Sequence, residues 1–404
     1  MKKTLPLIPI FVLMLNACSP ASGIAAATPT PVPSPAPTQP ACSVIPFEPT
    51  PIPGTDSRFP AVSASDWSKG PADAATTIVI YDDFQCVECN DHVLSVLSEL
   101  HPEDLRLVYR HFPQTDRYDK TYLAAQAAEA AGRQGHFWEM HDLLYEKQAE
   151  WVTMTPEEFK TWVMDKAERL SLERARFETD FNDPLILSRI KKAEANARAA
   201  GIPVLPLILI NGEVYVGPTD FNAFDQVVRL YALSKHQFSA CPEMTINPTR
   251  QYIATIKTKK GDIVIELYAD KAPLTVNSFI FLARNGWYDG VTFHRVIANL
   301  MAQAGDPSGT GVGGPGYYFR NEIDPSLHFD KPGMVGMDNQ RAGLNGSQFF
   351  ITLSAQPSLD GLYTIFGHVL SGMDVLVKLT PVDPSKEATL PRGDLILSVT
   401  IEEQ

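Results

Sequence analysis

Two stretches decide the fold of the C-terminal part of this chain: Phe293-His294-Arg295-Val296-Ile297 and, further along, Asn345-Gly346-Ser347-Gln348-Phe349-Phe350-Ile351. Between them stand Met301, Gln303 and the turn Gly305-Asp306-Pro307. Short apolar runs with glycine-rich breaks between them are typical of β-strands joined by turns. The surrounding sequence therefore predicts a β-dominated domain.

The residues that open this domain support that prediction. Tyr252 to Thr258 and Asp262 to Tyr268 alternate apolar and polar side chains, and Lys260-Gly261 between them is a hairpin signal. One helix is expected, from Pro273 to Arg284. Many short strands with a single helix predict an all-β-dominated closed barrel.

The motifs resemble the active-site face of cyclophilin-type peptidyl-prolyl cis-trans isomerases, and the resemblance runs from about Tyr252 to Glu402. Rotation about an Xaa-Pro bond faces a barrier of about 18–20 kcal/mol because amide resonance must be broken. A fixed donor to the prolyl nitrogen lowers that barrier, and the resemblance assigns this role to Arg295. It implies that Gln303 orients Arg295 and contacts the substrate. Both are expected to be catalytic.

The resemblance also implies a set of substrate-binding residues, which combine a pocket for the proline ring with contacts to the flanking chain. These are Phe293, Leu300, Met301, Asn339, Phe350 and Leu359. Leu300 stands where the family usually has phenylalanine, and Ser358 where many members have tryptophan. His294 belongs to the motif, but a purely structural histidine is an equal alternative. The glycine-rich segment from Gly309 to Gly316 lacks the lysine of a phosphate-binding loop and is expected to be a surface loop.

An earlier region predicts a second domain, of mixed α/β type. A β-rich run, Thr77 to Tyr81, leads into Cys86-Val87-Glu88-Cys89 and an amphipathic helix with apolar residues up to Leu100. The elements expected after it are a strand at Leu105–Phe112, an alanine-rich helix at Tyr122–Ala131, a helix capped by Thr155-Pro156-Glu157-Glu158, and two strands at Leu207–Val216 joined by an Asn-Gly turn. This order predicts an α/β thioredoxin-like domain with a helical insertion.

The segment Asp83-Phe84-Gln85-Cys86-Val87-Glu88-Cys89 resembles the motif of DsbA-like disulfide oxidoreductases. The resemblance implies that Cys86 attacks disulfides, that Cys89 resolves the mixed disulfide, and that Pro206 is a cis-proline shaping the substrate groove. A helix N-terminus would stabilise a Cys86 thiolate, whereas Glu88 disfavours it. Two alternatives stay open: a zinc half-site, which needs about two further ligands, and an inert structural disulfide.

The N-terminal end reads as an export signal. Lys2 and Lys3 precede an apolar run from Leu5 to Ala17 that is too short to cross a bilayer as a mature helix. Its end, Leu15-Asn16-Ala17-Cys18, resembles the lipobox of bacterial lipoproteins, which implies lipidation of Cys18. The alternative is an ordinary signal peptide. Both predict a location outside the cytoplasm.

Of the 5 cysteines, Cys42 and Cys241 remain after the lipidation site and the Cys-x-x-Cys pair. An even remainder in an oxidising compartment favours a disulfide that closes the ends of the first domain, with two free thiols as the alternative. The predicted organisation is a signal peptide (1–18), a proline-rich disordered linker (19–58), the DsbA-like domain (59–240), a connector (241–250) and the cyclophilin-type domain (251–404).

The net charge of −13 argues against nucleic acid as a partner.

Taken together, the two motifs and the export signal predict a peptidyl-prolyl isomerase that assists folding in the bacterial cell envelope. It is expected to be anchored to the membrane through lipid and to carry an attached thiol-disulfide oxidoreductase-like domain. Its expected partners are folding envelope proteins with Xaa-Pro bonds and cysteines and a redox recycling partner; no cofactor and no metal are expected. One alternative is a non-catalytic tethered scaffold for proline-containing chains; another is an oxidoreductase that uses the C-terminal domain to recruit substrate.

Overall fold

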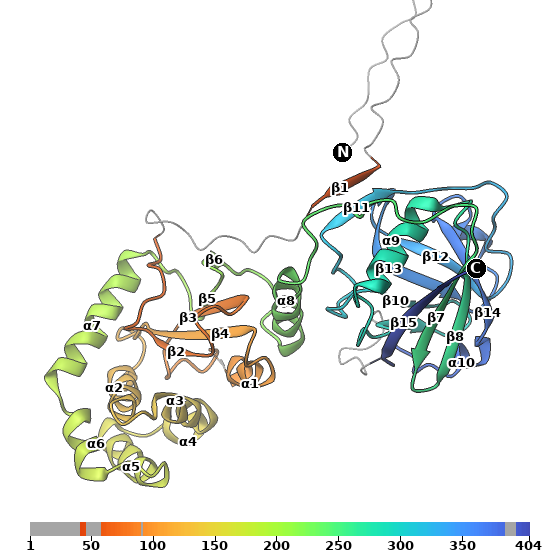
Figure 1. The fold of residues 1–404 in the computed structure, drawn as a ribbon. Coiled ribbons are helices and arrows are strands. Elements are labelled where there is room, and N and C mark those ends of the chain that lie inside the picture. Colours follow the sequence, from red (N-terminus) through yellow and green to blue (C-terminus); the bar gives the residue numbers. More distant parts are fainter. Residues whose placement is uncertain (1–40, 46–57, 90–91, 384–392) are drawn as a thin grey trace, which may run out of the picture. The chain divides into compact units, whose positions relative to one another are not determined.

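The computed structural model describes residues 41–45, 58–89, 92–383 and 393–404 (Figure 1). The predicted signal peptide, Cys18 and most of the proline-rich segment lie outside these residues. Among the helices that the structure describes, none has the length and apolar character needed to cross a membrane.

The N-terminal domain is built on a sheet of five described strands in the order β2-β4-β3-β5-β6. The strands are β2 (Trp67–Lys69), β3 (Thr76–Asp82), β4 (Leu105–His111), β5 (Leu207–Ile210) and β6 (Glu213–Val214). β3 is buried along its whole length, runs parallel to β4 and antiparallel to β5. A parallel neighbour requires a crossover, and helix α1 (His92–Leu100) provides it. This is the predicted thioredoxin-like arrangement.

The helical insertion lies between β4 and β5, as predicted. Its helices are α2 (Thr121–Gly132), α3 (Phe137–Glu146), α4 (Gln148–Trp151), α5 (Pro156–Arg169), α6 (Arg174–Phe181) and α7 (Pro184–Ala199); α8 (Phe221–Ser234) follows β6. The alanines of α2 are buried and let large rings such as Trp151 and Phe159 pack against it. Thr155 and Glu158 form the predicted capping box at the start of α5. The predicted Asn-Gly turn joins β5 to β6, which is shorter than expected.

The C-terminal domain contains the strands from β7 onward, and the first two of them lie where the sequence pattern predicted. They are β7 (Tyr252–Thr258), β8 (Gly261–Leu267), β9 (Arg295–Ile297), β10 (Met301–Ala304), β11 (Tyr317–Arg320), β12 (Met334–Arg341), β13 (Leu344–Thr352), β14 (Ile365–Ser371) and β15 (Ile396–Glu403). The helical elements are α9 (Pro273–Arg284), the 3-10 turn η1 (Pro357–Leu359) and α10 (Met373–Val377). α9 is the predicted helix. These strands curl around one apolar core.

The pairing of the strands is less complete than a closed barrel requires. The ladders run in the order β11-β13-β12-β14-β8-β7-β15, while β10 pairs with both β13 and β9. Between β15 and β9 the described residues show only a single bridge, from Leu395 to Thr292. The domain is therefore a strongly curled sheet rather than the continuously paired barrel that the sequence predicted.

Part of the segment that was predicted to be a disordered linker is a β-strand in the structure. Cys42–Val44 forms a strand, β1, which pairs antiparallel with β11 at the edge of the C-terminal sheet. Cys42 and Cys241 form the predicted disulfide, with a Cα–Cα distance of 6.2 Å. Its setting differs from the prediction, because it fastens β1 and the connector beside the C-terminal sheet instead of closing the N-terminal domain upon itself.

Candidate active site

The hairpin of β9 and β10 brings the two predicted catalytic side chains together. Gln303 stands directly opposite Arg295 in the antiparallel ladder, so both point to the same face of the hairpin. Arg295 Nη1 donates to Gln303 Oε1 at 3.4 Å and lies 3.8 Å from Met301 Sδ. The guanidinium is therefore held between an amide oxygen and the thioether of Met301.

Two acceptors fix the orientation of the Gln303 amide. Gln303 Nε2 donates to Asp338 Oδ2 at 3.2 Å and to Gln348 Oε1 at 3.1 Å. With its nitrogen engaged by two oxygens, the amide must present its own oxygen to Arg295. Asp338 was not predicted from the sequence; it comes from β12, whereas Gln348 comes from β13.

The carboxyl group of Asp338 is half-buried, and burial raises its pKa. The backbone N–H of Asn339 and the charge of Arg295 act in the opposite direction, lowering the pKa. The site thus holds a cation and an acidic group on either side of one glutamine.

A glycine-rich loop supports this network from behind. Gln348 Nε2 donates to the carbonyl of Gly313 at 3.0 Å. The loop is wrapped around Asp306, which is fully buried and accepts from the backbone N–H groups of Ser308, Gly311 and Gly313. Asp306 therefore holds the loop together from inside. The predicted surface loop is exposed at Gly311 and Val312, whereas residues 313–316 are buried.

An apolar cluster lies beside the hairpin. Its buried members are Phe329, Met334, Phe350 and Ile365, and Met301, Leu359 and Tyr363 are among the partly buried residues packed against them. The rings of Phe350 and Phe329 are stacked 5.5 Å apart. The structure thus brings together Met301, Phe350 and Leu359, three of the residues predicted to hold the proline ring.

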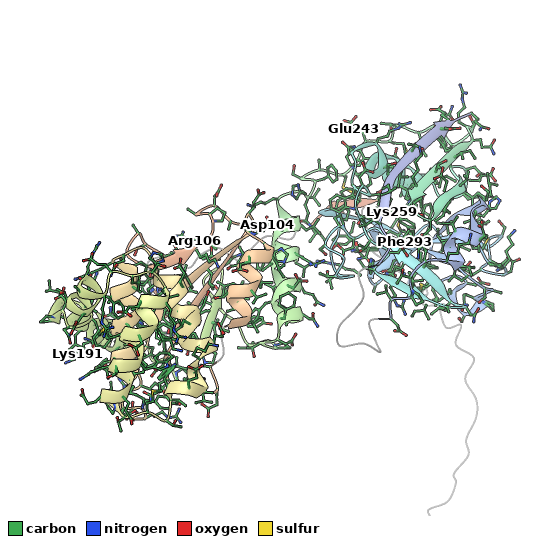
Figure 2. All side chains as sticks on the ribbon, turned by 90° about the horizontal axis from the view of Figure 1, so that it is seen from below. Asp104, Arg106, Lys191, Glu243, Lys259 and Phe293 are labelled. Atoms are coloured by element: carbon green, nitrogen blue, oxygen red, sulfur yellow. A yellow bond between two sulfur atoms is a disulfide. The ribbon has the colours of Figure 1, made fainter. Side chains whose placement is uncertain are left out.

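The other predicted contact residues lie differently. Leu300 is half-buried in the turn between β9 and β10. Among the described residues, it does not belong to the apolar cluster beside the hairpin. Phe293, labelled in Figure 2, is fully buried in the main core, so it supports the hairpin and cannot touch a substrate. Asn339 is half-buried on β12, and its Nδ2 donates to the carbonyl of Leu362 at 2.8 Å.

His294 is 7% exposed, and burial lowers its pKa. The nearby charge of Asp306 acts against that effect, and the charge of Arg295 adds to it. A buried, neutral imidazole beside Arg295 favours the structural alternative for this histidine.

A second site lies in the N-terminal domain, where Cys86 and Cys89 form a disulfide in the turns that follow β3. Both cysteines are buried, while Val87 and Glu88 between them are exposed. Helix α1 is described from His92, and residues 90 and 91 lie outside the described part. Stabilisation of a Cys86 thiolate by a helix N-terminus therefore stays a prediction.

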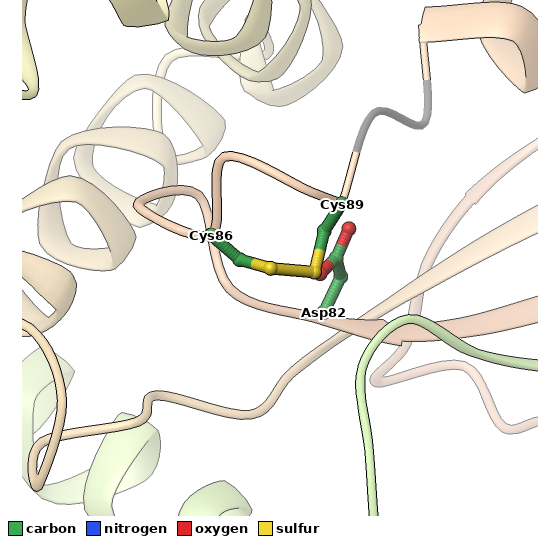
Figure 3. A group of neighbouring side chains, drawn as sticks. All are labelled: Asp82, Cys86 and Cys89. Atoms are coloured by element: carbon green, nitrogen blue, oxygen red, sulfur yellow. A yellow bond between two sulfur atoms is a disulfide. The ribbon is translucent and has the colours of Figure 1, made fainter.

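The carboxylate of Asp82 lies beside this disulfide, as Figure 3 shows, with an oxygen within 4.8 Å of both sulfur atoms. Asp82 is 1% exposed, and it accepts from Tyr145 Oη at 2.8 Å and from the backbone N–H of Asp83 at 2.7 Å. It closes strand β3. An acidic residue directly after the β-rich run Thr77 to Tyr81 was the sequence signal that could have identified it.

The loop that carries the cysteines is braced by the helical insertion. Gln148 Nε2 donates to the carbonyl oxygens of Phe84 and Cys86 at 2.8 and 2.9 Å. Pro206 follows a cis peptide bond, as predicted, and the residue before it, Leu205, packs in the same cluster as both cysteines. The cis bond thus lies next to the cluster that holds Cys86 and Cys89, and a role of Pro206 in a substrate groove stays a prediction.

Glu88 lies close enough to influence Cys86, with 3.8 Å between its Oε2 and the Cys86 sulfur. A carboxylate at that distance disfavours a thiolate, as expected from the sequence. For metal binding, Asp82, Cys86 and Cys89 are one group of neighbouring donors, but two sulfurs joined in a disulfide are not thiolate ligands.

Comparisons with known proteins agree with the division of the chain into two domains. The family model described as cyclophilin type peptidyl-prolyl cis-trans isomerase matches residues 253–401, and a model described as thioredoxin matches residues 63–229. Peptidyl-prolyl cis-trans isomerase-like 1 of Rhizopus delemar is 50% identical over 127 residues, which are 31% of this chain and 77% of that protein. Peptidyl-prolyl cis-trans isomerase A of Mycobacterium tuberculosis is 45% identical over 145 residues, 32% of this chain and 80% of that protein.

One relative is much longer than the shared domain, and one solved structure consists almost entirely of it. The isomerase-like 2 protein of Rhizopus delemar is 50% identical over 145 residues, and the chain spans only 27% of its length. A solved cyclophilin-type isomerase from Cryptosporidium parvum is 34% identical, with 38% of this chain and 98% of that chain covered and a TM-score of 0.35. Through its C-terminal domain, which follows a thioredoxin-like domain, the chain belongs to the cyclophilin-type peptidyl-prolyl cis-trans isomerase family.

Proposed function

We propose that this chain is an active peptidyl-prolyl cis-trans isomerase of the bacterial cell envelope, with a thiol-disulfide oxidoreductase on the same chain. The observation that carries the isomerase proposal is the position of Arg295, which Gln303 holds beside the apolar cluster of Met301, Phe350 and Leu359, the side chains that would bind the proline ring. A donor and a ring-binding pocket are the two parts that the reaction needs.

The reaction needs no proton transfer and no covalent step. The pocket takes the proline ring, and Arg295 donates to the prolyl nitrogen as that nitrogen becomes pyramidal and loses amide resonance. The guanidinium stays charged at all relevant pH values, so this donor is always available. Because Gln303 restrains it before the substrate arrives, little reorganisation is needed during rotation.

Exchange spectroscopy by NMR on an Xaa-Pro peptide tests the proposal. The full chain is expected to accelerate cis-trans exchange, and Arg295→Ala is expected to remove most of that acceleration, by about two orders of magnitude, the usual scale for losing one stabilising donor. Acceleration that persists in Arg295→Ala would reject this role for the arginine. Peptide binding without acceleration would leave the non-catalytic scaffold as the function.

Disulfide exchange at the second site is supported by the Cys86–Cys89 disulfide beside Asp82. A substrate thiolate attacks the Cys86 sulfur, the bond between Cys86 and Cys89 breaks, and Cys89 leaves as a thiolate. A second substrate thiolate then attacks the mixed disulfide and releases Cys86, so the substrate is oxidised by two electrons and the cysteine pair is reduced. In the reverse direction Asp82 would accept the proton of Cys89.

Trapping experiments test this activity. A Cys89→Ser variant is expected to accumulate mixed disulfides through Cys86, whereas a Cys86→Ser variant is not. An inert structural disulfide predicts that neither variant traps a substrate. A redox partner that recycles the pair is part of the proposal, because every turnover changes its oxidation state.

The envelope location rests on the export signal and on Cys18. We propose that lipid on Cys18 tethers the chain to a membrane, where its partners would be folding proteins with Xaa-Pro bonds and cysteines. Labelling with a radioactive fatty acid should mark the natural chain and not a Cys18→Ala variant. Release of an unlabelled, soluble natural protein would support the plain signal peptide instead.

A further inference from the structure

Asp338 occupies an irregular position in the C-terminal sheet. The β12–β13 ladder pairs Met337 with Phe349 and Asn339 with Asn345, so Asp338 stands opposite a bulge of three residues, 346–348. Because this bulge removes Asp338 from the regular pairing, its side chain can turn towards β10 and reach the Gln303 amide at 3.2 Å. Bulges often redirect a side chain in this way beside an active site.

The charge of Asp338 is placed where it can attract or repel the side chains of a bound peptide. The acidic group is partly buried, with Arg295 on the far side of Gln303 and Asn339 next in sequence. Charges at the edge of a protein interior are less screened than fully solvated ones. Gln303 contacts both groups, so a peptide that reaches Arg295 with its prolyl nitrogen lies one side chain away from the Asp338 carboxylate.

We propose that Asp338 makes this site selective for chains that carry a lysine or arginine within two residues of the proline. The proposal rests on the proposed isomerase function and names its substrate class. A cationic side chain would be attracted to the Asp338 carboxylate, whereas an acidic side chain at the same position would be repelled by it. The uncharged residues of the pocket provide the affinity for the proline ring, and Asp338 adds the choice of flanking charge.

The test compares three peptides that differ in one residue beside the Ala-Pro unit: lysine, glutamine or glutamate. NMR titration of the full chain gives the Kd of each peptide, and exchange spectroscopy gives the catalysed rate. We expect the lysine peptide to be favoured over the glutamate peptide by about three- to tenfold at low salt, the scale of one partly exposed charge pair. The preference should fall towards unity in 0.5 M salt, about the concentration at which such pairs are screened.

Two variants locate the origin of the preference. Asp338→Asn keeps an oxygen that can accept from Gln303 but removes the charge, so the lysine-to-glutamate ratio should fall to about one. Asp374→Asn removes one negative charge from α10, where Asp374 is exposed and paired with Lys378, and should leave the ratio as in the natural chain. An equal fall in both variants would attribute the preference to net charge and overturn the proposal.

The outcomes also separate this inference from the isomerase proposal. If no peptide is isomerised but the ratio of Kd values depends on Asp338, the isomerase proposal fails and the charge preference stands. If all peptides are isomerised with equal efficiency, the isomerase proposal stands and the inference fails. Absence of binding by every peptide would overturn both.

Discussion

Tyr145 donates a 2.8 Å hydrogen bond to Asp82, the carboxylate that lies next to the Cys86–Cys89 disulfide. Tyr145 belongs to α3, within the helical insertion, and Asp82 ends β3 of the thioredoxin-like sheet. The insertion therefore contributes a side chain to the surroundings of the Cys86–Cys89 disulfide. A hydrogen bond to an ionised carboxylate stabilises its charged form, and this effect is larger when the carboxylate is buried.

Replacing this tyrosine should alter the pH dependence of disulfide exchange. In Tyr145→Phe, the carboxylate of Asp82 loses the hydrogen bond that orients it beside the disulfide, so it is less well placed to accept the proton of Cys89. We expect the rate of reaction of the reduced pair with a small disulfide to fall about threefold to tenfold near neutral pH and to recover at higher pH, where a cysteine thiol loses its proton without help. Stopped-flow rates between pH 5 and 9 provide the measurement.

The matched control is Tyr215→Phe, in which the lost hydroxyl donates to the backbone of Pro218 on an exposed turn. Its rate profile should follow that of the natural chain. A uniform fall in rate for Tyr145→Phe, without displacement along the pH axis, would show that the tyrosine acts only through packing.

An isosteric change at Gln303 should be more damaging than its size suggests. Gln303→Glu replaces the Nε2 donor by an oxygen that faces the oxygens of Asp338 and Gln348. Since two acceptors cannot satisfy each other when buried, we expect a loss of about 1–3 kcal/mol in the free energy of unfolding and at least a tenfold loss of isomerase rate. Urea unfolding and NMR exchange measure the two effects.

Gln251→Glu is the matched control, because Gln251 makes a comparable hydrogen bond at the surface: its Nε2 donates to Glu266 at 2.8 Å. Gln251→Glu creates a similar pair of carboxylates in solvent, where repulsion is screened, and should change stability by less than about 0.5 kcal/mol. Equal effects of the two substitutions would contradict the importance that we give to the buried amide.

The Cys42–Cys241 disulfide should stabilise the C-terminal domain. With both cysteines changed to serine, β1 is held only by its pairing with β11, and we expect the free energy of unfolding of that domain to fall by about 2–4 kcal/mol. Unfolding followed by calorimetry, with separate transitions for the two domains, provides the measurement. A decrease confined to the N-terminal transition would contradict the assignment of this disulfide to the C-terminal sheet.

Acid should weaken the N-terminal domain through Glu129. Burial alone would raise the pKa of Glu129, but hydrogen bonds from His111 and Trp67 outweigh it and hold the pKa below its ordinary value of 4.5. A carboxyl group whose pKa is lower in the folded state stabilises the fold above its unfolded pKa, and this contribution disappears as the pH falls through the folded value. Stability should therefore decline below about pH 5.

Glu129→Gln is expected to reduce stability at pH 7 by about 1–2 kcal/mol and to flatten the acid part of the curve, because the amide does not titrate. Thermal unfolding at several pH values distinguishes these effects. A variant whose acid profile remains as steep as that of the natural chain would show that other carboxyl groups dominate the acid response.

The sequence predicted those parts of the two sites that are close in the chain or carry a family motif. Arg295 and Gln303 belong to one hairpin, so their meeting follows from local pairing. Asp338 reaches Gln303 because β12 and β10 both pair with β13. The sequence pattern does not show which strands pair with each other, so it could not predict this contact. The sequence could therefore identify the donor and the pocket but not the acidic group beside them.

Strand β1 was missed for a different reason. It contains three residues within a proline-rich segment, which is too few for an alternating pattern to be recognised. Its structure comes from the partner strand β11 and from the disulfide, both remote in sequence. Leu300 was misjudged for another reason. The resemblance identified its position as part of the substrate site, but leucine stands there in place of the family's usual phenylalanine and does not join the apolar cluster.

The disulfide between Cys42 and Cys241 also determines how the chain would respond to cutting and to tension. It encloses the whole N-terminal domain in a covalent loop, with a sequence separation of 199 between the two cysteines. A protease that cuts once inside this loop would leave both products joined until a reductant acts. A pull applied at the N-terminal end would be transmitted through the disulfide to the C-terminal domain, and the N-terminal domain would carry none of the load.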